Sequence, residues 1–505
     1  MTASGDYKEF EQAVPSFYTE LECYENTHLS ASDAQVTLKD LYRELERECP
    51  WPDQSHFHCS PFPIFLSRST IAKMGDVAEA LSNSISSIID RWWSESSSEL
   101  RNIIPLDPKA TELLRWLDEP EQRAARPYHR NLGFWRPDFV LEDIHPESSG
   151  QQEKPDWPIK ICEINARYAC NGFIMGAHVD RYTRRNLGAG HVSAYTPKLD
   201  DVYKSTFNRG KKLFIVRGNV KGLDINMLKP YLEQHDVCAA RFIAPSDLVL
   251  HGVEQKHNER ALKVSVPDTD CKRCKGSCCK VLETVEQAVL EVAQAELLSL
   301  PSEILKVLAL VATNDMRTIF LAHDKRMLGI ILQELPRLVT VENIISHSQA
   351  NLLRQTLLPT ISPGTPQMVH ILEEFRKGEH SKDDWILKPV GGGKGHGIVF
   401  GHEVASEAEW LSLMERNQGT TQSAANLETG LCALQPYVRQ PRHDLVVAQD
   451  GTSGWHLARK RSMFLVGTMM MAAGRYIGTT VWRANTDPIC AVLRGGNWFA
   501  AVTNL

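Results

Sequence analysis

The chain has 505 residues, more than one ordinary hydrophobic core can hold, so two or three packed units are expected. Its composition is that of a soluble globular protein, 42% hydrophobic and 23% charged, and its net charge of -6 argues against nucleic acid or an acidic membrane surface as a main partner. No apolar run approaches the ~20 residues that a membrane helix needs. The first residues, MTASGDYKEFEQ, carry no export signal, so a cytoplasmic protein with reduced cysteines is expected.

Residues 1 to about 120 are predicted to be mainly helical. The segment that starts at Ala72 places Met74, Val77, Leu81 and Ile85 on one helical face. This region is therefore expected to pack as a helical N-terminal layer.

A hairpin with metal-binding chemistry is predicted next. Two short β-type runs, FVL after Asp138 and IKICEI before Asn165, flank the polar loop HPESSGQQEKPDWP. Alternate strand residues share a face, so Glu163 and Asn165 point to the same side. If the strands pair, Asp138, Glu163 and Asn165 bring together three oxygen ligands of the kind that hold Mg²⁺ against phosphates. The alternative is a solvated hairpin with unrelated charges.

The middle of the chain predicts a small Rossmann-like unit. Residues around 181–210 are polar and are expected to form a linker. The runs KKLFIVRG, LDINMLKPYLEQH and VCAARFIA then alternate as strand, helix and strand. LVLHG and ALKVSV are expected to form a hairpin with a cysteine cluster at its tip, and long helices are expected from about Leu282.

The cysteine cluster, CKRCKGSCCK, begins with the spacing of a zinc knuckle. Lysines between the thiols would also lower their pKa values and make them redox-sensitive. A second Cys-x-x-Cys at a proper distance is missing, so we favour the alternative of a mobile basic insertion. The candidate Zn²⁺ ligands are Cys271, Cys274, Cys278 and Cys279, or a tetrahedral set in which Cys278 or Cys279 joins the first two cysteines and His251 or His257.

A glycine loop, WILKPVGGGKGHGIVFG, begins at Trp385. Apolar strands flank the loop, glycines let backbone N–H groups approach phosphates, and lysines supply charge, so the pattern predicts a lid over a nucleotide. It fits neither a P-loop nor the dinucleotide fingerprint, and the alternative is a surface turn. His396 is expected to be exposed rather than catalytic. The residues predicted to bind the nucleotide here are Lys388, Gly391, Gly392, Gly393, Lys394, Gly395 and Gly397.

The strings RPDF, IKICEINA, LFIVRG and ILKPVGGG, in this order, resemble the ATP-grasp superfamily, and in particular its circularly permuted branch that includes eukaryotic glutathione synthetase. The resemblance implies an α+β, circularly permuted ATP-grasp fold with an inserted Rossmann-like β-α-β substrate domain and a helical N-terminal region. The domains expected from it are 1–205, with the metal-binding hairpin; 206–320, the substrate domain with the cysteine-rich insertion; and 321–505, the lid with its glycine loop and a C-terminal substrate loop.

The resemblance also implies roles for single residues. Lys325, in HDKRML, would be a second nucleotide lysine, and Arg136 and Arg483 would meet the reacting groups. Gln435, Tyr437 and Val438, in LQPYV, would form the adenine hinge. The cofactors implied are ATP and one or two Mg²⁺ ions. One departure stands out: glutathione synthetases carry a metal-binding glutamate inside the glycine loop, and here Pro389, Val390 and Gly391 follow Lys388 with no acid.

Together these features predict an ATP-dependent carboxylate–amine ligase that forms an amide or peptide bond through an acyl phosphate. The alternatives are an ATP-grasp small-molecule kinase and a non-catalytic nucleotide-binding protein. The partners expected are a small carboxylate and an amine, with no nucleic acid and no membrane; a homodimer is one candidate assembly. Arg136 and Arg483 favour an anionic substrate. Trp482, Trp498 and Phe499 indicate either an apolar group on a substrate or simple packing.

Overall fold

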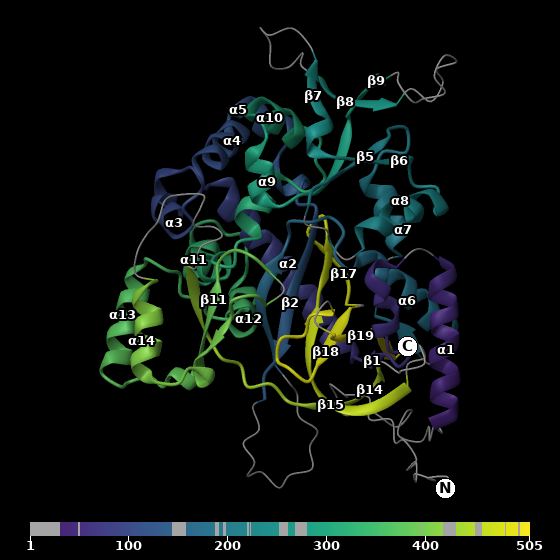
Figure 1. Ribbon diagram of the computed structural model, residues 1–505. Helices are drawn as coiled ribbons and strands as arrows, with labels where there is room; N and C mark the ends of the chain where they lie inside the picture. Colours follow the sequence, from purple (N-terminus) through teal and green to yellow (C-terminus); the bar gives the residue numbers. More distant parts are fainter. Residues whose placement is uncertain are drawn as a thin grey trace.

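An antiparallel sheet at the centre of the molecule joins strands from both halves of the chain (Figure 1). The computed structural model describes residues 31–48, 51–143, 158–186, 191–194, 198–219, 222, 224–251, 261–267, 280–393, 395–417, 431–449, 457–479, 481–492 and 495–504. The strands of the central sheet are β2 (Phe134–Leu141), β3 (Ile159–Asn165), β14 (His443–Gln449), β15 (Leu457–Thr468), β16 (Met470–Ala472), β17 (Arg475–Gly478), β18 (Trp482–Asn485) and β19 (Asn497–Phe499).

Strand β2 is the element around which this sheet is built. It pairs antiparallel with β3, as the sequence predicted, and also with β15 and β16. The register sets Asp138 opposite both Glu163 and Thr468. Residues that are hundreds of positions apart in the sequence thus lie opposite each other on neighbouring strands.

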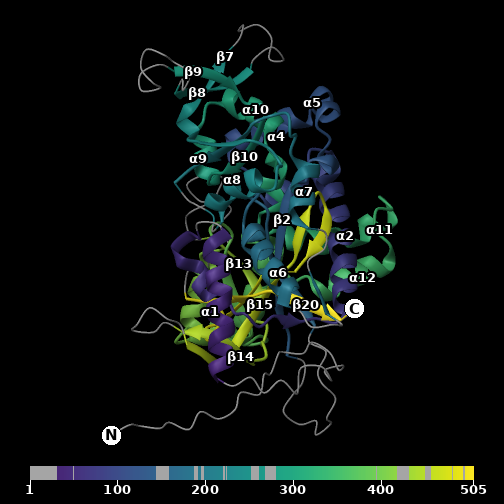
Figure 2. The same cartoon turned by 90° about the vertical axis from the view of Figure 1, so that its right-hand side faces the viewer.

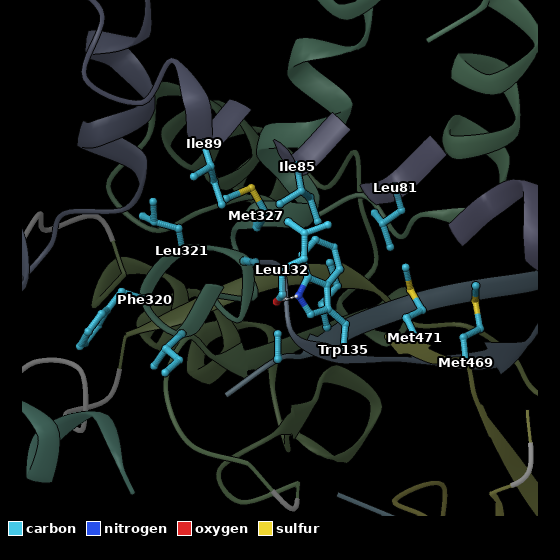
Figure 3. Packing of buried hydrophobic residues seen from close by; sticks show 14 of the residues in the cluster. Leu81, Ile85, Ile89, Leu132, Trp135, Phe320, Leu321, Met327, Met469 and Met471 are labelled. Carbon is cyan, nitrogen blue, oxygen red and sulfur yellow. Dashed lines mark hydrogen bonds between the residues drawn. The ribbon is translucent and has the colours of Figure 1, made fainter. Parts of the chain in front are cut away.

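Helix α2 (Arg68–Asp90) packs against β17 and against two later helices, α11 (Met327–Thr340) and α12 (His347–Thr356). The helix begins where the Ser67 side chain accepts a hydrogen bond from the Thr70 N–H. Figure 3 shows its side chains Leu81, Ile85 and Ile89 facing the side on which Trp135 and Met471 lie. Burial of each such side chain stabilises the fold by about 1.5–3 kcal/mol, so the helical N-terminal layer anchors β2.

A parallel sheet of order β10-β5-β6 forms a second unit. Its central strand, β5 (Leu213–Arg217), leads through α8 (Ile225–Gln234) to β6 (Ala240–Ile243), and this is the predicted strand-helix-strand order. The third strand, β10 (Gln287–Glu291), pairs parallel with β5. A β-α-β connection of this kind needs the crossover helix that α8 supplies.

Strands β7 (Leu248–His251), β8 (Ala261–Pro267) and β9 (Lys280–Thr284) form an antiparallel sheet at one end of the molecule, far from β14 in both views (Figures 1 and 2). The predicted β7–β8 pair is present. The cysteine cluster, however, follows β8 and precedes β9, so the prediction that it lies at the tip of the β7–β8 hairpin was wrong. Its four cysteines and His257 lie outside the described residues, whereas His251 ends β7.

The glycine loop connects two strands of a small antiparallel sheet that has its own core. The sheet consists of β12 (Val399–Phe400), β11 (Trp385–Pro389) and β13 (Cys432–Pro436). Helices α13 (Pro366–Arg376) and α14 (Glu407–Glu415) cover it, with Phe375 and Trp410 buried between them. The predicted hairpin around the loop is therefore present.

The remaining elements complete the layers. Strand β20 (Ala501–Asn504) pairs with β1 (Ile64–Phe65) and β4 (His191–Ser193). The other α-helices of the described residues are α1 (Ala31–Glu48), α3 (Ser98–Ile103), α4 (Pro108–Asp118), α5 (Pro120–Ala125), α6 (Phe173–Asn186), α7 (Leu199–Thr206), α9 (Gln294–Ser299) and α10 (Ser302–Val311). None of the helices in the described part of the chain combines the length and apolar character needed to cross a membrane.

Two expectations about the middle of the chain were wrong. The segment 181–210 is not a linker, because it holds the end of α6, β4 and α7, and α7 buries Leu199, Val202 and Tyr203 at helical spacing. Long helices do not begin at Leu282 either. That residue lies on β9, and the next helix along the chain, α9, begins only after β10.

Candidate active site

The β2–β3 hairpin brings the predicted oxygen ligands together. Asp138 lies opposite Glu163, and Arg136 lies opposite Asn165. The Asn165 side-chain amide donates hydrogen bonds to Asp138 Oδ2 at 2.9 Å and to Glu163 Oε1 at 3.2 Å. The solvated-hairpin alternative does not describe this arrangement, because all these side chains line one cavity.

Asp138 is the centre of a closed charge network. The residue is 2% exposed, and its Oδ2 lies 2.8 Å from Arg483 Nη2 on β18. Its Oδ1 accepts a hydrogen bond from Thr468 at 3.0 Å and lies 3.3 Å from Arg136 Nε. Both carboxylate oxygens are thus engaged, and the contacts of Asp138 are those of a residue that holds two arginines in place.

Arg136 has a second anchor outside the sheet. Its Nη1 donates to the backbone oxygen of Asn171 at 2.9 Å and to the Asn171 side-chain oxygen at 2.8 Å. The guanidinium is therefore fixed between β2 and the segment that leads into α6. Its Nη2 also donates to Asp138 Oδ2 at 3.3 Å, so one N–H of this nitrogen remains for an anionic substrate in the cavity.

Glu163 faces lysines rather than arginines. Its Oε2 lies 3.3 Å from Lys388 Nζ, which also donates to the backbone oxygen of Cys162 at 3.0 Å. Burial raises the pKa of Glu163, but the charges of Lys388 and Lys325 outweigh that effect and hold the pKa well below its ordinary value. Glu163 is therefore a carboxylate at neutral pH, set between two cations that are predicted to bind phosphates.

Lys325 follows a tight, irregular turn. A π-helical segment, Thr318–Ala322, precedes it, a geometry often found at functional sites. The flanking Asp324 and Arg326 form a buried ion pair of 2.7 Å. Lys325 Nζ donates to the Gly392 backbone oxygen at 3.1 Å, so this lysine contacts the glycine loop directly. Burial lowers the pKa of Lys325, and the Glu163 carboxylate partly offsets this.

His323 was missed by the sequence analysis. Its Nδ1 lies 3.1 Å from the Ile164 backbone oxygen, which ties the Lys325 turn to β3. Burial, with the charges of Arg167 and Lys325, lowers its pKa to about 4, so the ring is neutral at physiological pH. Its position two residues before Lys325 is the sequence signal that could have identified it.

The glycine loop adopts the backbone conformations that only glycine takes easily. Gly392, Gly395 and Gly397 have φ values of 77°, 71° and 73°. A Cβ atom at Gly395 would collide with the side chain of Ile489, so the loop packs closely on the segment after β18. His396 is exposed, as expected, and Lys394 lies outside the described residues.

One cavity of about 1490 Å³ gathers the predicted site. Apart from Lys394, every residue predicted to be catalytic, nucleotide-binding or Mg²⁺-binding lines it, including Gln435, Tyr437 and Val438 near β13. Gln435 is fully buried and donates to Thr360 Oγ1 at 2.9 Å. Trp482, Trp498 and Phe499 are buried core residues that do not line the cavity, which agrees with the packing interpretation.

The oxygen atoms near Lys388 fit a magnesium ion better than any thiol or imidazole site. Within the described ranges, no three or more His, Cys, Asp or Glu side chains cluster as metal ligands would. Mg²⁺ needs few protein oxygens, because phosphates and water complete its octahedron. Glu163, whose side chain is 24% exposed, and Asn165 are the groups at the cavity that could supply such oxygens, whereas Asp138 is 2% exposed and is held by two arginines.

Comparisons with known proteins agree with these features. Residues 77–321 match the family model described as the AnkG N-terminal domain. The chain is 28% identical over 445 residues to the ATP-grasp enzyme ankG of Aspergillus thermomutatus, covering 86% of this chain and 87% of that protein. A glutathione synthetase-like effector from Globodera pallida, solved without ligand, superposes with a TM-score of 0.53 at 11% identity, over 94% of this chain and 97% of that one.

These findings confirm the resemblance to ATP-grasp, glutathione synthetase-like proteins. The mixed helix and sheet architecture is that of the glutathione synthetase-like neighbour.

Proposed function

We propose that this chain is an ATP-dependent ligase that joins a small carboxylic acid to an amine. The observation that carries the proposal is the meeting of Glu163, Lys325 and Lys388 beneath the glycine loop in one cavity. This arrangement suits a bound triphosphate, with the arginine pair Arg136 and Arg483 at the same cavity to receive an acid.

The reaction would proceed in two steps. A carboxylate oxygen of the acid attacks the γ-phosphorus of ATP, which gives an acyl phosphate and ADP. The amine then attacks the acyl carbon, phosphate leaves, and an amide forms. Arg136 and Arg483 would orient the acid by paired hydrogen bonds, and Lys325 and Lys388 would neutralise charge on the phosphates. The loop from Gly391 to Gly397 would exclude water, which would otherwise hydrolyse the acyl phosphate.

Of the three predicted ligands, Glu163 and Asn165 would hold the magnesium ion, and Asp138 would orient Asn165 by accepting a hydrogen bond from its amide nitrogen, which also donates to Glu163. When bound, the ion supplies charge neutralisation at the phosphate oxygens. The chain's own part is to keep Glu163 ionised, which the two lysines do.

The finer architecture belongs to the same proposal. We assign residues 1–205 to the helical region with the metal hairpin, 206–320 to a Rossmann-like substrate domain, and 321–505 to the lid of a circularly permuted ATP-grasp fold. The parallel β10-β5-β6 sheet supports the second assignment. The late position of the glycine loop, after the β2–β3 hairpin, supports the third.

The proposal is tested by comparing Glu163→Gln with Glu142→Gln. Both carboxylates belong to the same hairpin region and pair with a lysine, but the Glu142–Lys160 pair lies outside the cavity. We expect Glu163→Gln to lower acceptor-dependent ADP release by about 100-fold or more, as loss of a preorganised electrostatic contact does. Glu142→Gln is expected to retain normal turnover. Near-normal turnover of Glu163→Gln would overturn the assignment.

A non-catalytic nucleotide-binding protein is the second candidate, favoured by the absence of an acid between Lys388 and Gly391. Hydroxylamine trapping separates the candidates. A ligase gives a hydroxamate from its acyl phosphate, a kinase acting on an alcohol gives ADP without hydroxamate, and a binding protein gives neither.

A further inference from the structure

The cavity is larger than a nucleotide site requires. Ligand pockets commonly measure about 300–1000 Å³, and this one measures about 1490 Å³. It extends from the glycine loop to a wall made by Gly222 and by the α9 residues Gln294 and Leu298. This second end is available for the acid substrate.

The cavity carries an excess of positive charge. Among the described residues that line it, seven are lysines or arginines and three are aspartates or glutamates. Two of the arginines, Arg136 and Arg483, already share the carboxylate of Asp138. The nucleotide phosphates would take up Lys325 and Lys388, so at least one further cation of this described lining remains for another anionic group.

Arg167 is a cation of this kind. It lies two residues after Asn165 and lines the cavity. Its charge acts on the buried Glu291, but no carboxylate of the described residues comes within ion-pair distance of it. Its Nε is buried without a hydrogen-bond partner, and its guanidinium lies 4.3 Å from the centre of the Tyr168 ring. An arginine that packs over an aromatic ring has a restricted orientation for its fork of N–H donors.

Tyr168 supplies a second unused donor. The residue is 9% exposed and lines the cavity, and its buried hydroxyl has the Arg167 side chain beside it but no acceptor for its own proton among the described residues. Burial raises the pKa of Tyr168 to about 12, so the hydroxyl keeps its proton. A buried hydroxyl without an acceptor is costly, and an oxygen atom of a ligand would remove that cost.

The pair lies between the two ends of the cavity. Arg167 follows Ala166, whose N–H donates to His323 Nδ1 at 3.3 Å on the turn that carries Lys325, and Tyr168 lines the same cavity as the α9 residues. A group bound to Arg167 and Tyr168 would therefore share the cavity with the phosphate lysines.

We propose that Arg167 and Tyr168 bind a second carboxylate of the acid substrate, so that the substrate class is an acid with two carboxylates. This inference rests on the proposed ligase function. One carboxylate reacts at Arg136 and Arg483, and the other is held by the Arg167 fork and the Tyr168 hydroxyl. Arg167 is thus a specificity-determining residue that remains outside the chemical step.

The test is binding of matched acids to the full chain in the presence of Mg²⁺ and a non-hydrolysable ATP analogue. The probes are malonate, succinate and glutarate against propionate, butyrate and valerate, measured by calorimetry. We expect at least one dicarboxylate to bind about tenfold or more tightly than the monocarboxylate of equal length, as one charged hydrogen bond provides. Arg167→Met should abolish this preference, Tyr168→Phe should reduce it, and the affinity for the ATP analogue should stay unchanged.

Arg115→Met is the matched control, because Arg115 also lies 4.3 Å over an aromatic ring, that of Trp93, but away from the cavity. It should keep the preference. If Arg167→Met weakens the ATP analogue as much as the dicarboxylate, Arg167 contacts phosphate and the inference is wrong. If the wild type lacks the preference yet releases ADP with monocarboxylates, the ligase assignment stands and the dicarboxylate subsite does not. If the wild type does not bind the ATP analogue, both proposals fall.

Discussion

Asp138 and Glu163 lie opposite each other on neighbouring strands, yet they belong to two different regions of the site. Asp138 is nearly fully buried in the lining of the cavity, and Arg136, Arg483 and Thr468 engage both its oxygens. Glu163 faces the small sheet of the lid and meets Lys388 across the cavity. We call the first region closed because its carboxylate is 2% exposed, and the second open because its carboxylate is 24% exposed at the cavity.

The largest expected effect that sharpens this comparison is on stability. Asp138→Asn leaves the guanidinium groups of Arg136 and Arg483, 12% and 14% exposed, without their shared counter-charge. Breaking a buried ion pair in this way costs about 3–5 kcal/mol. Glu163→Gln also removes the counter-charge of Lys388, but it keeps an oxygen acceptor beside that lysine on a side chain that is 24% exposed, against 2% for Asp138, so it should cost less than Asp138→Asn, about 1–3 kcal/mol. Urea unfolding followed by tryptophan fluorescence measures both, and equal losses would mean that the two regions do not differ.

The pH dependence of the free energy of unfolding should distinguish Glu163, in the open region, from the neighbouring His323. The pKa of His323 is about 4 in the folded chain and about 6.5 when unfolded. The folded state favours the neutral ring, so its contribution is complete above about pH 6.5 and is lost as the pH falls toward 4, by about 2–3 kcal/mol. Glu163, whose pKa is also lowered, loses its contribution only below the ordinary glutamate value of about 4.3.

A plot of the free energy of unfolding against pH between 4.5 and 7 should therefore be flatter in His323→Gln and keep its slope in Glu163→Gln. His443, on β14 and outside the cavity, also has a pKa lowered to about 4 by burial. His443→Gln should flatten the plot of the free energy of unfolding over the same pH range. Because His443 lies outside the cavity, adding ATP should not change the effect of this substitution. An unaltered slope in His323→Gln would show that its ring is not buried as a neutral group.

The contrast between the two regions also explains what the sequence could predict. Strand periodicity placed Glu163 and Asn165 on one face, and the glycine spacing located the loop, because both are local patterns. The closed region is not local: Thr468 and Arg483 reach Asp138 from more than 300 residues away. Resemblance suggested Arg483, but no local pattern shows that Asp138 would be fully engaged. Short elements such as α7 and β10 were missed because each offers only a few apolar positions.

The smallest expected effects come from the glycine loop, where three positions separate two causes of strain. Gly393 has open space around it and no positive φ, and Gly392 has a φ of 77° in open space. Gly395 combines a φ of 71° with the side chain of Ile489 at the place that an added methyl group would occupy.

Gly393→Ala should leave ADP release unchanged. Gly392→Ala adds only the left-handed backbone cost of about 1–2 kcal/mol, and Gly395→Ala adds a steric clash to it. Turnover should be least reduced in Gly393→Ala, more in Gly392→Ala and most in Gly395→Ala, by about tenfold at the last. The free energy of unfolding in urea should fall by no more than the strain itself, about 1–2 kcal/mol in Gly392→Ala, because a loop can relax locally. If Gly392→Ala and Gly395→Ala were equally impaired, backbone conformation alone would control the open region, and the packing of the loop on Ile489 would have no part in catalysis.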